Sequence, residues 1–423
     1  MDKFVIKGGS PLKGTIPVSG SKNAALPLMA ASLLGNTAST LKNIPRLKDI
    51  YTFNNVIRVV GAQVTFHEDE NTLIIDPENV NHLEAPYDLV RKMRASFYML
   101  GALVGKHGYA KVSLPGGCAW GPRPVDLHLK GMEAMGIDIS LEKGYVIAKA
   151  PDKVAGGTFK LEPSSVGATV NLLLASVLKS KEFIIENAAK EPDVVQLCNH
   201  LVSMGANIEG IGTGTLTIRA VDELKGIEVA NDPDRIELGT FMILGAMLPE
   251  TELKLTGCNP EHLGSFTKKL RETGATINID GTTIDIKAPE TLKPVSIKTQ
   301  IYPGFPTDLQ AQWATMMTQA EGESKVTDTV YFDRFSYVPE LTRLGAELDV
   351  EKNTVHISGK TPLTGASVMS TDLRASVSLV LAALVAENTT EVLRIYHLDR
   401  GYEALEDKLQ AVGAHIERVD EES

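Results

Sequence analysis

The chain has 423 residues, enough for about two to three domains and a large buried core. Hydrophobic residues make up 43% and charged residues 22%, as in ordinary globular proteins, and the 5% aromatic content predicts a mainly aliphatic core. The net charge of −11 argues against a nucleic-acid-binding protein, which would usually present a basic face. It does not exclude an anionic substrate, because a cleft can be locally basic.

Cysteine content and apolar runs limit the other classes. Three cysteines cannot form a disulfide framework, and no CxxC pair suggests a metal site. The N-terminus has no apolar run long enough for a signal peptide. The longest apolar stretch, residues 375–386, is far short of the ~20 residues needed to span a bilayer. We therefore expect a cytoplasmic protein that binds neither membrane nor nucleic acid.

One short phrase occurs six times along the chain: a glycine, a small or aliphatic residue, a variable position and an aliphatic residue. Its copies begin about seventy residues apart, which predicts six repeats of one supersecondary unit. They are Gly61-Ala-Gln-Val64, Gly136-Ile-Asp-Ile139, Gly205-Ala-Asn-Ile208, Gly274-Ala-Thr-Ile277, Gly345-Ala-Glu-Leu348 and Gly413-Ala-His-Ile416.

The first repeat gives the order of elements within a unit. Strand, helix, strand, helix and hairpin follow one another, and Gly61 ends the second helix, as glycine does just past a C-terminus. The predicted ranges are 14–18, 22–34, 37–41, 48–60, and 63–67 with 72–76.

The two helices of a repeat differ in their apolar pattern. The second is amphipathic, with Ile50, Phe53 and Ile57 on one stripe and Asn54 off it. The first is apolar on nearly every side and must be buried on every side. Its counterparts are residues 95–105, 168–178, 238–248 and 373–386. We predict an α/β fold with helices at the centre, and with sheets and amphipathic helices outside.

Charged or phosphate-compatible residues recur where these central helices begin. If the helix starts converge, their amides and partial positive charges would form an anion-binding cleft. N-capping is the alternative for Ser165, Asp234 and Thr307. Capping explains cations at such starts poorly, because a cation is unfavourable there without an anion. The starts are Lys22-Asn23, Arg91 to Arg94, Ser165 to Gly167, Asp234-Arg235, Thr307-Asp308 and Asp372 to Arg374.

A loop rich in glycine and proline interrupts the second repeat between Pro115 and His128. Its cysteine, Cys118, lies near cations and is expected to be reactive with a lowered pKa; the alternative is a small buried hydrophobe. We expect Cys198 and Cys258 to be small buried hydrophobes of this kind. Arg123 supplies a planar donor fork suited to phosphate.

These segments together resemble the UDP-N-acetylglucosamine 1-carboxyvinyltransferases, the enolpyruvyl transferases of peptidoglycan synthesis. The resemblance covers essentially the whole chain. It rests on Lys22-Asn23, Pro115-Gly-Gly-Cys118 running into Arg123-Pro-Val-Asp126-Leu-His128, Ser165-Val-Gly-Ala-Thr169, Pro303-Gly-Phe-Pro-Thr-Asp308, Thr371-Asp372-Leu-Arg374-Ala-Ser376 and Asp399-Arg400-Gly-Tyr402.

The resemblance implies two inside-out α/β barrel globules, each of three βαβαββ repeats, joined by two crossing strands and closing over the substrate. One globule would span residues 21–229, and the other would combine residues 1–20 with 230–423. The implied reaction transfers the enolpyruvyl group of phosphoenolpyruvate to the 3′-hydroxyl of UDP-N-acetylglucosamine and releases phosphate, the first committed step of peptidoglycan precursor synthesis. It needs no metal or organic cofactor, and we expect no obligate protein partner.

The resemblance also implies residue roles. Cys118 would be the general acid and the target of fosfomycin, and Asp308 the base near the 3′-hydroxyl, with helix capping as its alternative. Surface ion pairing is the alternative for Arg334 and Arg374. Phosphoenolpyruvate would be bound by Lys22, Asn23, Arg123, Arg334, Arg374 and Arg400. UDP-N-acetylglucosamine would be bound by Asn23, Arg94, Arg123, Pro124, Val125, Asp126, Leu127, Ser165, Gly167, Asp308 and Val330. Supporting roles fall to Asp49, His128 and Asp372.

Three other functions compete. The related 5-enolpyruvylshikimate-3-phosphate synthases share the six-repeat fold but not this cysteine loop. A non-catalytic nucleotide-sugar-binding paralogue would not need an acid and a base together. A phosphate-binding glycine motif is suggested by the spacing of Gly9 and Gly14, but Thr15-Ile16 follows where a Walker A sequence has Lys-Ser/Thr.

Overall fold

The computed structural model describes residues 2–115 and 125–420. The chain folds into two compact units. Residues 20–232 form one, here the inserted unit, and residues 1–19 with 233–423 form the other, here the terminal unit. None of the described helices combines the length and the apolar character needed to cross a membrane.

The inserted unit contains the first three glycine phrases. Its helices are α1 (Lys22–Ala31), η1 (Ser32–Leu34), α2 (Lys48–Val59), η2 (Glu68–Glu70), α3 (Tyr87–Val90), η3 (Arg94–Phe97), α4 (Tyr98–His107), α5 (Asp126–Met135), α6 (Val166–Ser176) and α7 (Pro192–Met204). Its strands are β3 (Ser39–Lys42), β4 (Gln63–His67), β5 (Thr72–Asp76), β6 (Glu84–Ala85), β7 (Tyr109–Ser113), β8 (Asp138–Glu142), β9 (Tyr145–Lys149), β10 (Gly157–Lys160), β11 (Phe183–Glu186), β12 (Asn207–Glu209), β13 (Thr215–Arg219) and β14 (Glu228–Ala230).

The terminal unit repeats the same order of elements. Its helices are α8 (Arg235–Met247), η4 (Pro260–Leu263), α9 (Gly264–Glu272), η5 (Thr307–Leu309), α10 (Gln310–Met317), α11 (Val338–Arg343), α12 (Leu373–Val385), η6 (Ile395–Arg400) and α13 (Leu405–Gln410). Its strands are β1 (Asp2–Lys7), β2 (Lys13–Pro17), β15 (Glu252–Thr256), β16 (Thr276–Asp280), β17 (Thr283–Lys287), β18 (Ile297–Lys298), β19 (Ser324–Thr327), β20 (Leu348–Glu351), β21 (Thr354–Ile357), β22 (Ser367–Met369), β23 (Thr389–Leu393) and β24 (His415–Asp420).

Every repeat builds one four-stranded sheet of the same pattern. A first strand pairs in parallel with a second, the second pairs antiparallel with a third, and the third pairs antiparallel with a fourth, as in β10-β11-β13-β12. In the described part of the chain each unit holds three such sheets. The other orders are β14-β3-β5-β4, β6-β7-β9-β8, β16-β17-β15-β2, β18-β19-β21-β20 and β22-β23-β1-β24.

Three sheets are completed by strands from distant parts of the sequence. Strand β2 pairs in parallel with β15 of the terminal unit, so the prediction that residues 14–18 open the first repeat is wrong. That place is taken by β14, which pairs in parallel with β3. The last sheet is completed by β1, which lies between β23 and β24.

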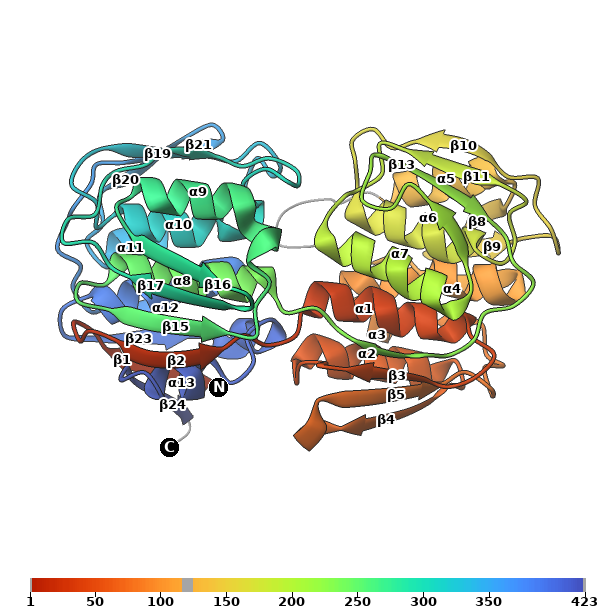
Figure 1. Cartoon of the computed structure of the whole chain (residues 1–423), viewed down its shortest axis with the longest axis horizontal. Coiled ribbons are helices and arrows are strands. Elements are labelled where there is room, and N and C mark those ends of the chain that lie inside the picture. Colours follow the sequence, from red (N-terminus) through yellow and green to blue (C-terminus); the bar gives the residue numbers. More distant parts are fainter. Residues whose placement is uncertain (1, 116–124, 421–423) are drawn as a thin grey trace. The chain divides into compact units, whose positions relative to one another are not determined.

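In both units the apolar helices lie inside the sheets (Figure 1). The central helices are α1, α4 and α6 in the inserted unit and α8, α10 and α12 in the terminal unit. Helix α12, for example, buries every residue from Arg374 to Leu384. Two of the central helices approach closely at Gly101 and Gly105 of α4. A Cβ there would lie 2.4 and 2.2 Å from main-chain oxygens of α6. The predicted inside-out α/β fold is confirmed.

The six glycines of the repeated phrase share one backbone conformation. Their φ angles lie between 98° and 116°, in the left-handed region that glycine adopts without a Cβ clash. Gly136 and Gly205 cap α5 and α7 in this conformation. The glycine of the repeated phrase therefore marks the C-terminal end of the second, outer helix of each repeat. On α2 the predicted apolar stripe is confirmed, but Asn54 is also buried, because it lies four residues from Ile50 and three from Ile57.

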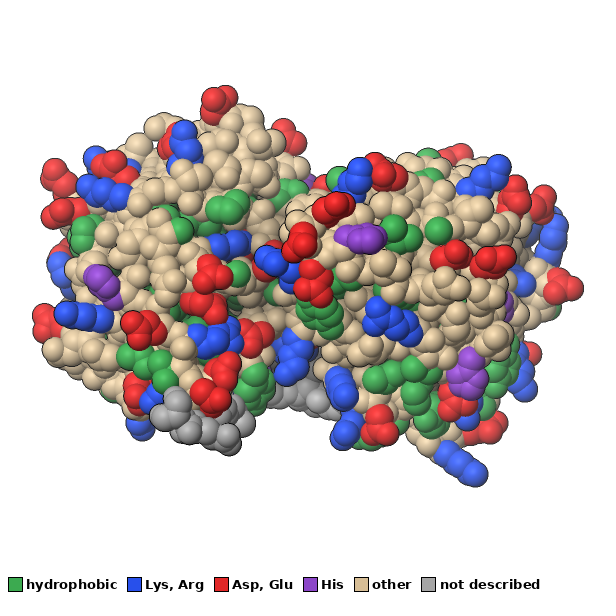
Figure 2. All heavy atoms as spheres, turned by 90° about the horizontal axis from the view of Figure 1, so that it is seen from below, with side chains coloured by type: hydrophobic (Ala, Val, Ile, Leu, Met, Phe, Trp, Pro, Cys, Tyr) green, Lys and Arg blue, Asp and Glu red, His purple; other side chains and the backbone are tan. Residues whose placement is uncertain are grey.

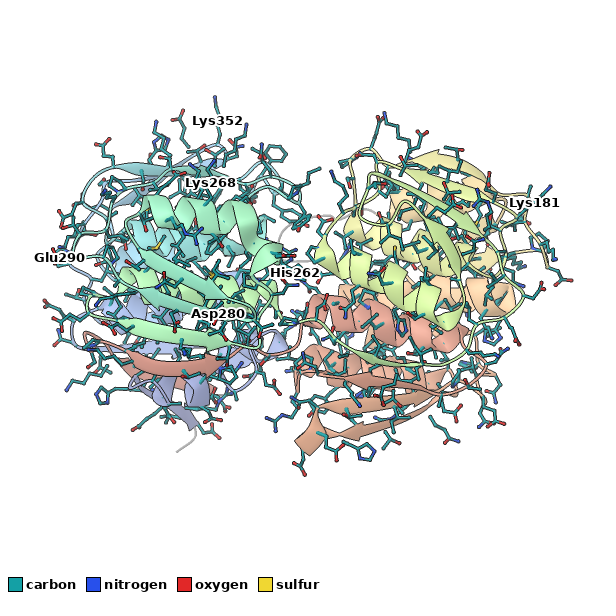
Figure 3. All side chains as sticks on the ribbon, in the orientation of Figure 1. Lys181, His262, Lys268, Asp280, Glu290 and Lys352 are labelled. Atoms are coloured by element: carbon teal, nitrogen blue, oxygen red, sulfur yellow. The ribbon has the colours of Figure 1, made fainter. Side chains whose placement is uncertain are left out.

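Charged side chains occupy the outside of this fold. Lys181, Glu290 and Lys352 project outward from peripheral turns and loops of their units (Figure 3). On the face drawn in Figure 2, acidic and basic side chains are interspersed.

Candidate active site

Asp308 of η5 forms ion pairs with two buried arginines of the terminal unit. Its Oδ1 lies 2.7 Å from Nη1 of Arg334, and its Oδ2 lies 3.3 Å from Nη2 of Arg374. The two arginine side chains are 8% and 7% exposed, so surface ion pairing is the wrong interpretation for them. Helix capping is also wrong for Asp308, because Pro306 is the N-cap of η5 and no side chain caps it.

The arginines keep the Asp308 carboxylate ionised. Burial alone would raise the pKa of Asp308, but the charges of Arg334 and Arg374 hold it well below its usual range, with a further contribution from Arg235. Burial would likewise lower the pKa of Arg374, and the Asp308 charge raises it instead. The site therefore presents a carboxylate surrounded by fixed positive charge.

A buried polar cluster fixes Arg374 from the opposite side. Nη1 of Arg374 lies 3.4 Å from the hydroxyl of Tyr402, which is 2.8 Å from Oγ1 of Thr240. Nε2 of Gln312 donates to the main-chain oxygen of Asp308 at 3.0 Å and to Thr240 Oγ1 at 3.3 Å. Thr240, Gln312 and Arg374 belong to α8, α10 and α12, so the starts of the three central helices of this unit converge.

The remaining predicted residues of the terminal unit surround this cluster. Asp372 is the N-cap of α12 and accepts hydrogen bonds from the amides of Arg374 and Ala375 at 2.9 and 3.1 Å. The amide of Val330 donates to Asp328 at 2.9 Å. Arg400 is half-buried at the end of η6, two residues before Tyr402.

In the inserted unit, Lys22 and Asp49 form a buried ion pair. Nζ of Lys22 lies 3.0 Å from Oδ2 of Asp49, with side chains 11% and 5% exposed. Lys22 is the first residue of α1, which Ser21 caps, and Asp49 lies in the first turn of α2. Half-buried Asn23 follows Lys22. Because a buried ion pair is costly to desolvate, the pair by itself is weak evidence for a gain in stability.

His128 is the centre of a second cluster in this unit. Its Nδ1 lies 2.8 Å from Nδ2 of Asn171, whose Nδ2 and Oδ1 also bond the main chain of Phe97 and Gly101 at 3.1 and 2.9 Å. Since that amide nitrogen can only donate, His128 Nδ1 accepts and its Nε2 carries the proton. Burial and the charge of Arg94 lower the pKa of His128 to about 3, so the ring is neutral.

The imidazole of His128 reaches the start of α6. A Cβ on Gly167 would lie 3.2 Å from His128 Cε1 and 3.3 Å from Nε2, so a side chain at Gly167 would displace the ring. Ser165 caps α6 by accepting from the amide of Ala168 at 3.2 Å, which confirms the capping interpretation. Asp234 likewise caps α8, whereas no cap is formed by Thr307.

Some predicted residues are placed without a defined contact, and others are not described. Val125 and Leu127 are half-buried at the start of α5, and Asp126 pairs with Lys130 at 3.3 Å. Cys118, Arg123 and Pro124 lie outside the described residues. Cys198 and Cys258 are each 1% exposed, which confirms that they are buried hydrophobes. Across residues 2–115 and 125–420, no group of three or more His, Cys, Asp or Glu could hold a metal ion.

Comparison with known proteins decides the family. A family model described as EPSP synthase (3-phosphoshikimate 1-carboxyvinyltransferase) matches residues 6–409. The UDP-N-acetylglucosamine 1-carboxyvinyltransferase of Chloroherpeton thalassium is 52% identical over 420 residues, 99% of this chain and 97% of the relative. The protein of that name from Pelodictyon phaeoclathratiforme is 50% identical, over 99% and 98% of the two chains. The chain belongs to the enolpyruvyl transferase family.

Solved structures agree with this assignment. The enolpyruvyl transferase NikO from Streptomyces tendae is 26% identical, with a TM-score of 0.90 over 99% of each chain. EPSP synthase from Acinetobacter baumannii, at 18% identity and a TM-score of 0.77 over 99% of this chain and 100% of that one, shares the fold.

Several residues of this transferase site were not found from the sequence. Thr240, Gln312 and Asp328 lie in separate repeats or on interior helix faces, where a single polar residue carries no spacing signal. Arg235 was named with Asp234 among the predicted charged helix starts, but no individual role was assigned to it.

Proposed function

We propose that this transferase moves the enolpyruvyl group of phosphoenolpyruvate onto the 3′-hydroxyl of UDP-N-acetylglucosamine and releases phosphate. The choice of acceptor is supported by the relatives named UDP-N-acetylglucosamine 1-carboxyvinyltransferase, which are 52% and 50% identical over 99% of this chain. The proposal places the protein in the cytoplasm, at the first committed step of peptidoglycan precursor synthesis, with no cofactor.

Asp308 is the base of the proposed reaction. Its carboxylate is ionised and so can accept the proton of the attacking hydroxyl, but two arginines make it a weak base. The carboxylate of phosphoenolpyruvate would compete for Arg334 and Arg374. When the substrate takes these guanidinium groups, the pKa of Asp308 rises and its basicity increases. The base is then strongest when the substrate is bound.

The atoms balance in two steps. The acceptor oxygen bonds to C2 of phosphoenolpyruvate as its proton passes to Asp308, and the methylene carbon receives a proton from Cys118. In the second step the Cys118 thiolate takes a proton back from the new methyl group, the bond from C2 to the phosphate oxygen breaks, and the proton on Asp308 passes to the departing phosphate. Fixed positive charge around the leaving phosphate stabilises the developing anion.

The other residues bind the two substrates. Lys22, with Asn23, is assigned to phosphoenolpyruvate because its ammonium group is buried beside a single carboxylate and can exchange it for phosphate. Arg123 and Arg400 share this role. His128, in contact with Gly167, supports the diphosphate at the start of α6. The nucleotide sugar is assigned to Arg94, Arg123, Pro124, Val125, Asp126, Leu127, Ser165, Gly167, Asn23, Asp308 and Val330.

Phosphate release tests the proposal directly. The full chain is incubated with phosphoenolpyruvate and either UDP-N-acetylglucosamine or shikimate 3-phosphate, and the product mass is measured. We expect release only with the nucleotide sugar, with an enolpyruvyl adduct as product. Release only with shikimate 3-phosphate would assign the other acceptor. Binding of UDP-N-acetylglucosamine without turnover would favour a non-catalytic paralogue.

A further inference from the structure

Asp328 is a fully buried carboxylate with no role in the reaction described so far. It follows β19 in the terminal unit and has 0% exposure. Its Oδ1 accepts from Thr299 Oγ1 at 2.7 Å and from the amides of Val330 and Tyr331 at 2.9 and 3.0 Å. Its Oδ2 accepts from Thr307 Oγ1 at 2.6 Å. The carboxylate thus binds four donors from three separate segments.

The bond to Thr307 sets the direction of a hydroxyl group. A threonine hydroxyl has one proton, and here the proton is given to Asp328, so the oxygen lone pairs face elsewhere. Nη1 of Arg334 donates to one of them at 3.2 Å. The same Nη1 lies 2.7 Å from Oδ1 of Asp308. Asp328, Thr307, Arg334 and Asp308 therefore form one continuous polar chain.

We propose that Asp328 is a positioning residue for the transfer reaction, orienting the Asp308 base through the Thr307 hydroxyl and Arg334. The inference rests on the proposed role of Asp308 and adds a residue that touches neither substrate. An ionised, hydrogen-bonded acceptor forms a stronger bond than a neutral one, so a carboxylate fixes Thr307 better than an amide would. Placement of a base matters because small displacements of a reacting group cost large factors in rate.

The substitution Asp328→Asn tests the hydrogen bond to Thr307 separately from the other hydrogen bonds of Asp328. In Asp328→Asn the amide oxygen can still accept from Val330 and Tyr331, which preserves the turn that they form. The amide nitrogen, at the place of Oδ2, cannot accept from Thr307 and donates to it instead. The Thr307 hydroxyl then accepts a hydrogen bond at this position, and its proton loses the acceptor that fixed its direction.

The experiment is a double-mutant cycle on the full chain, read as phosphate release with UDP-N-acetylglucosamine. We expect Asp328→Asn and Thr307→Val each to lower kcat about 10- to 100-fold, and the double variant to lose no more than the worse single one. The acid limb of the kcat/KM profile, which reports the free enzyme, should move to higher pH in both, because a loosened Arg334 lets the pKa of Asp308 rise. Thr327→Val removes a neighbouring hydroxyl that bonds Thr354 at 2.9 Å, and should leave kcat unchanged.

The outcomes distinguish the inference from the proposed function. If Asp308→Asn abolishes turnover but Asp328→Asn and Thr307→Val retain both kcat and the pH profile, the inference alone is overturned. Multiplicative losses in the double variant would also overturn it, since they mean that Asp328 acts independently of Thr307. If Asp308→Asn itself retains turnover, Asp308 is not the base. The proposed role of Asp308 and the positioning role of Asp328 are then both wrong. Should Asp328→Asn fail to fold, Thr307→Val with its pH profile decides the matter.

Discussion

The Asp308 carboxylate and the Arg374 guanidinium come from the starts of two adjacent repeats and meet at 3.3 Å inside the terminal unit. Arg374 is held in place by Tyr402 at 3.4 Å. The Asp308 carboxylate therefore pairs with the arginines that, in the proposed reaction, bind the carboxylate of phosphoenolpyruvate. Removing its charge should change both substrate binding and catalysis.

Asp308→Asn should lower kcat by about 10²- to 10⁴-fold, the usual contribution of a general base. It should also bind phosphoenolpyruvate more tightly, because Asp308 no longer competes for Arg334 and Arg374. Turnover and the Kd for phosphoenolpyruvate, from titration calorimetry with UDP-N-acetylglucosamine present, would be compared. Asp333→Asn, at an exposed carboxylate beside Arg334, is the control and should change neither. Weaker binding in Asp308→Asn would contradict the exchange of partners.

His200 should make the inserted unit sensitive to acid. The residue is 2% exposed on α7, its two ring nitrogens have no hydrogen-bond partner among residues 2–115 and 125–420, and burial lowers its pKa to about 4. Its contribution to stability is full above the unfolded pKa of about 6.5 and falls as pH drops toward 4, because the unfolded chain binds the proton more readily. The loss would amount to about 2–4 kcal/mol.

A non-titrating residue tests this dependence. Unfolding free energies of the wild type and His200→Leu would be measured by urea denaturation between pH 7 and pH 4. The wild type should lose more stability than His200→Leu over this range. His82→Leu, at an exposed histidine of the same unit, should follow the wild type. Parallel pH curves for wild type and His200→Leu would refute the role of His200.

Gly101→Ala should destabilise the inserted unit by about 1–3 kcal/mol, the usual cost of overpacking. The added Cβ would lie 2.4 Å from the main-chain oxygen of Asn171 and 2.7 Å from its Oδ1, so α4 and α6 must separate. Because Asn171 also bonds His128, the imidazole NMR signals should shift. Gly214→Ala is the control, since nothing lies within 4 Å of its Cβ. Equal stability of the two variants would exclude a close helix approach as the reason for Gly101.

The sequence predicted the elements well because their causes are local. The glycine phrase ends each outer helix by its own backbone conformation, and a helix apolar on all sides must be central. Pairing of β2 with β15 and of β14 with β3 could not be predicted, because the paired residues are 239 and 188 positions apart in the sequence. The resemblance supplied the individual residues, such as Asp308, but not their partners. Thr307 and Asp328 lie 21 residues apart in one repeat, and their hydrogen bond depends on how that repeat folds rather than on the local sequence.

Lys22 should depend on an anion for its stability in the interior. Asp49 is its partner at 3.0 Å, and Asp49→Asn leaves a buried ammonium unpaired, which typically costs about 3–5 kcal/mol. If Lys22 binds the phosphate of phosphoenolpyruvate, the ligand should replace the lost carboxylate. The increase in Tm on adding phosphoenolpyruvate, with UDP-N-acetylglucosamine present, should then be larger in Asp49→Asn than in the wild type.

A matched ion pair distinguishes this effect from general destabilisation. Lys111 and Glu84 also lie 3.0 Å apart in the inserted unit, but their side chains are 33% and 32% exposed. Glu84→Gln should lower Tm little, since exposed pairs contribute about 0–1 kcal/mol, and its response to phosphoenolpyruvate should equal that of the wild type. An equal ligand response in Asp49→Asn and Glu84→Gln would mean that Lys22 does not receive the substrate anion, and Asp49 would then be a structural partner alone.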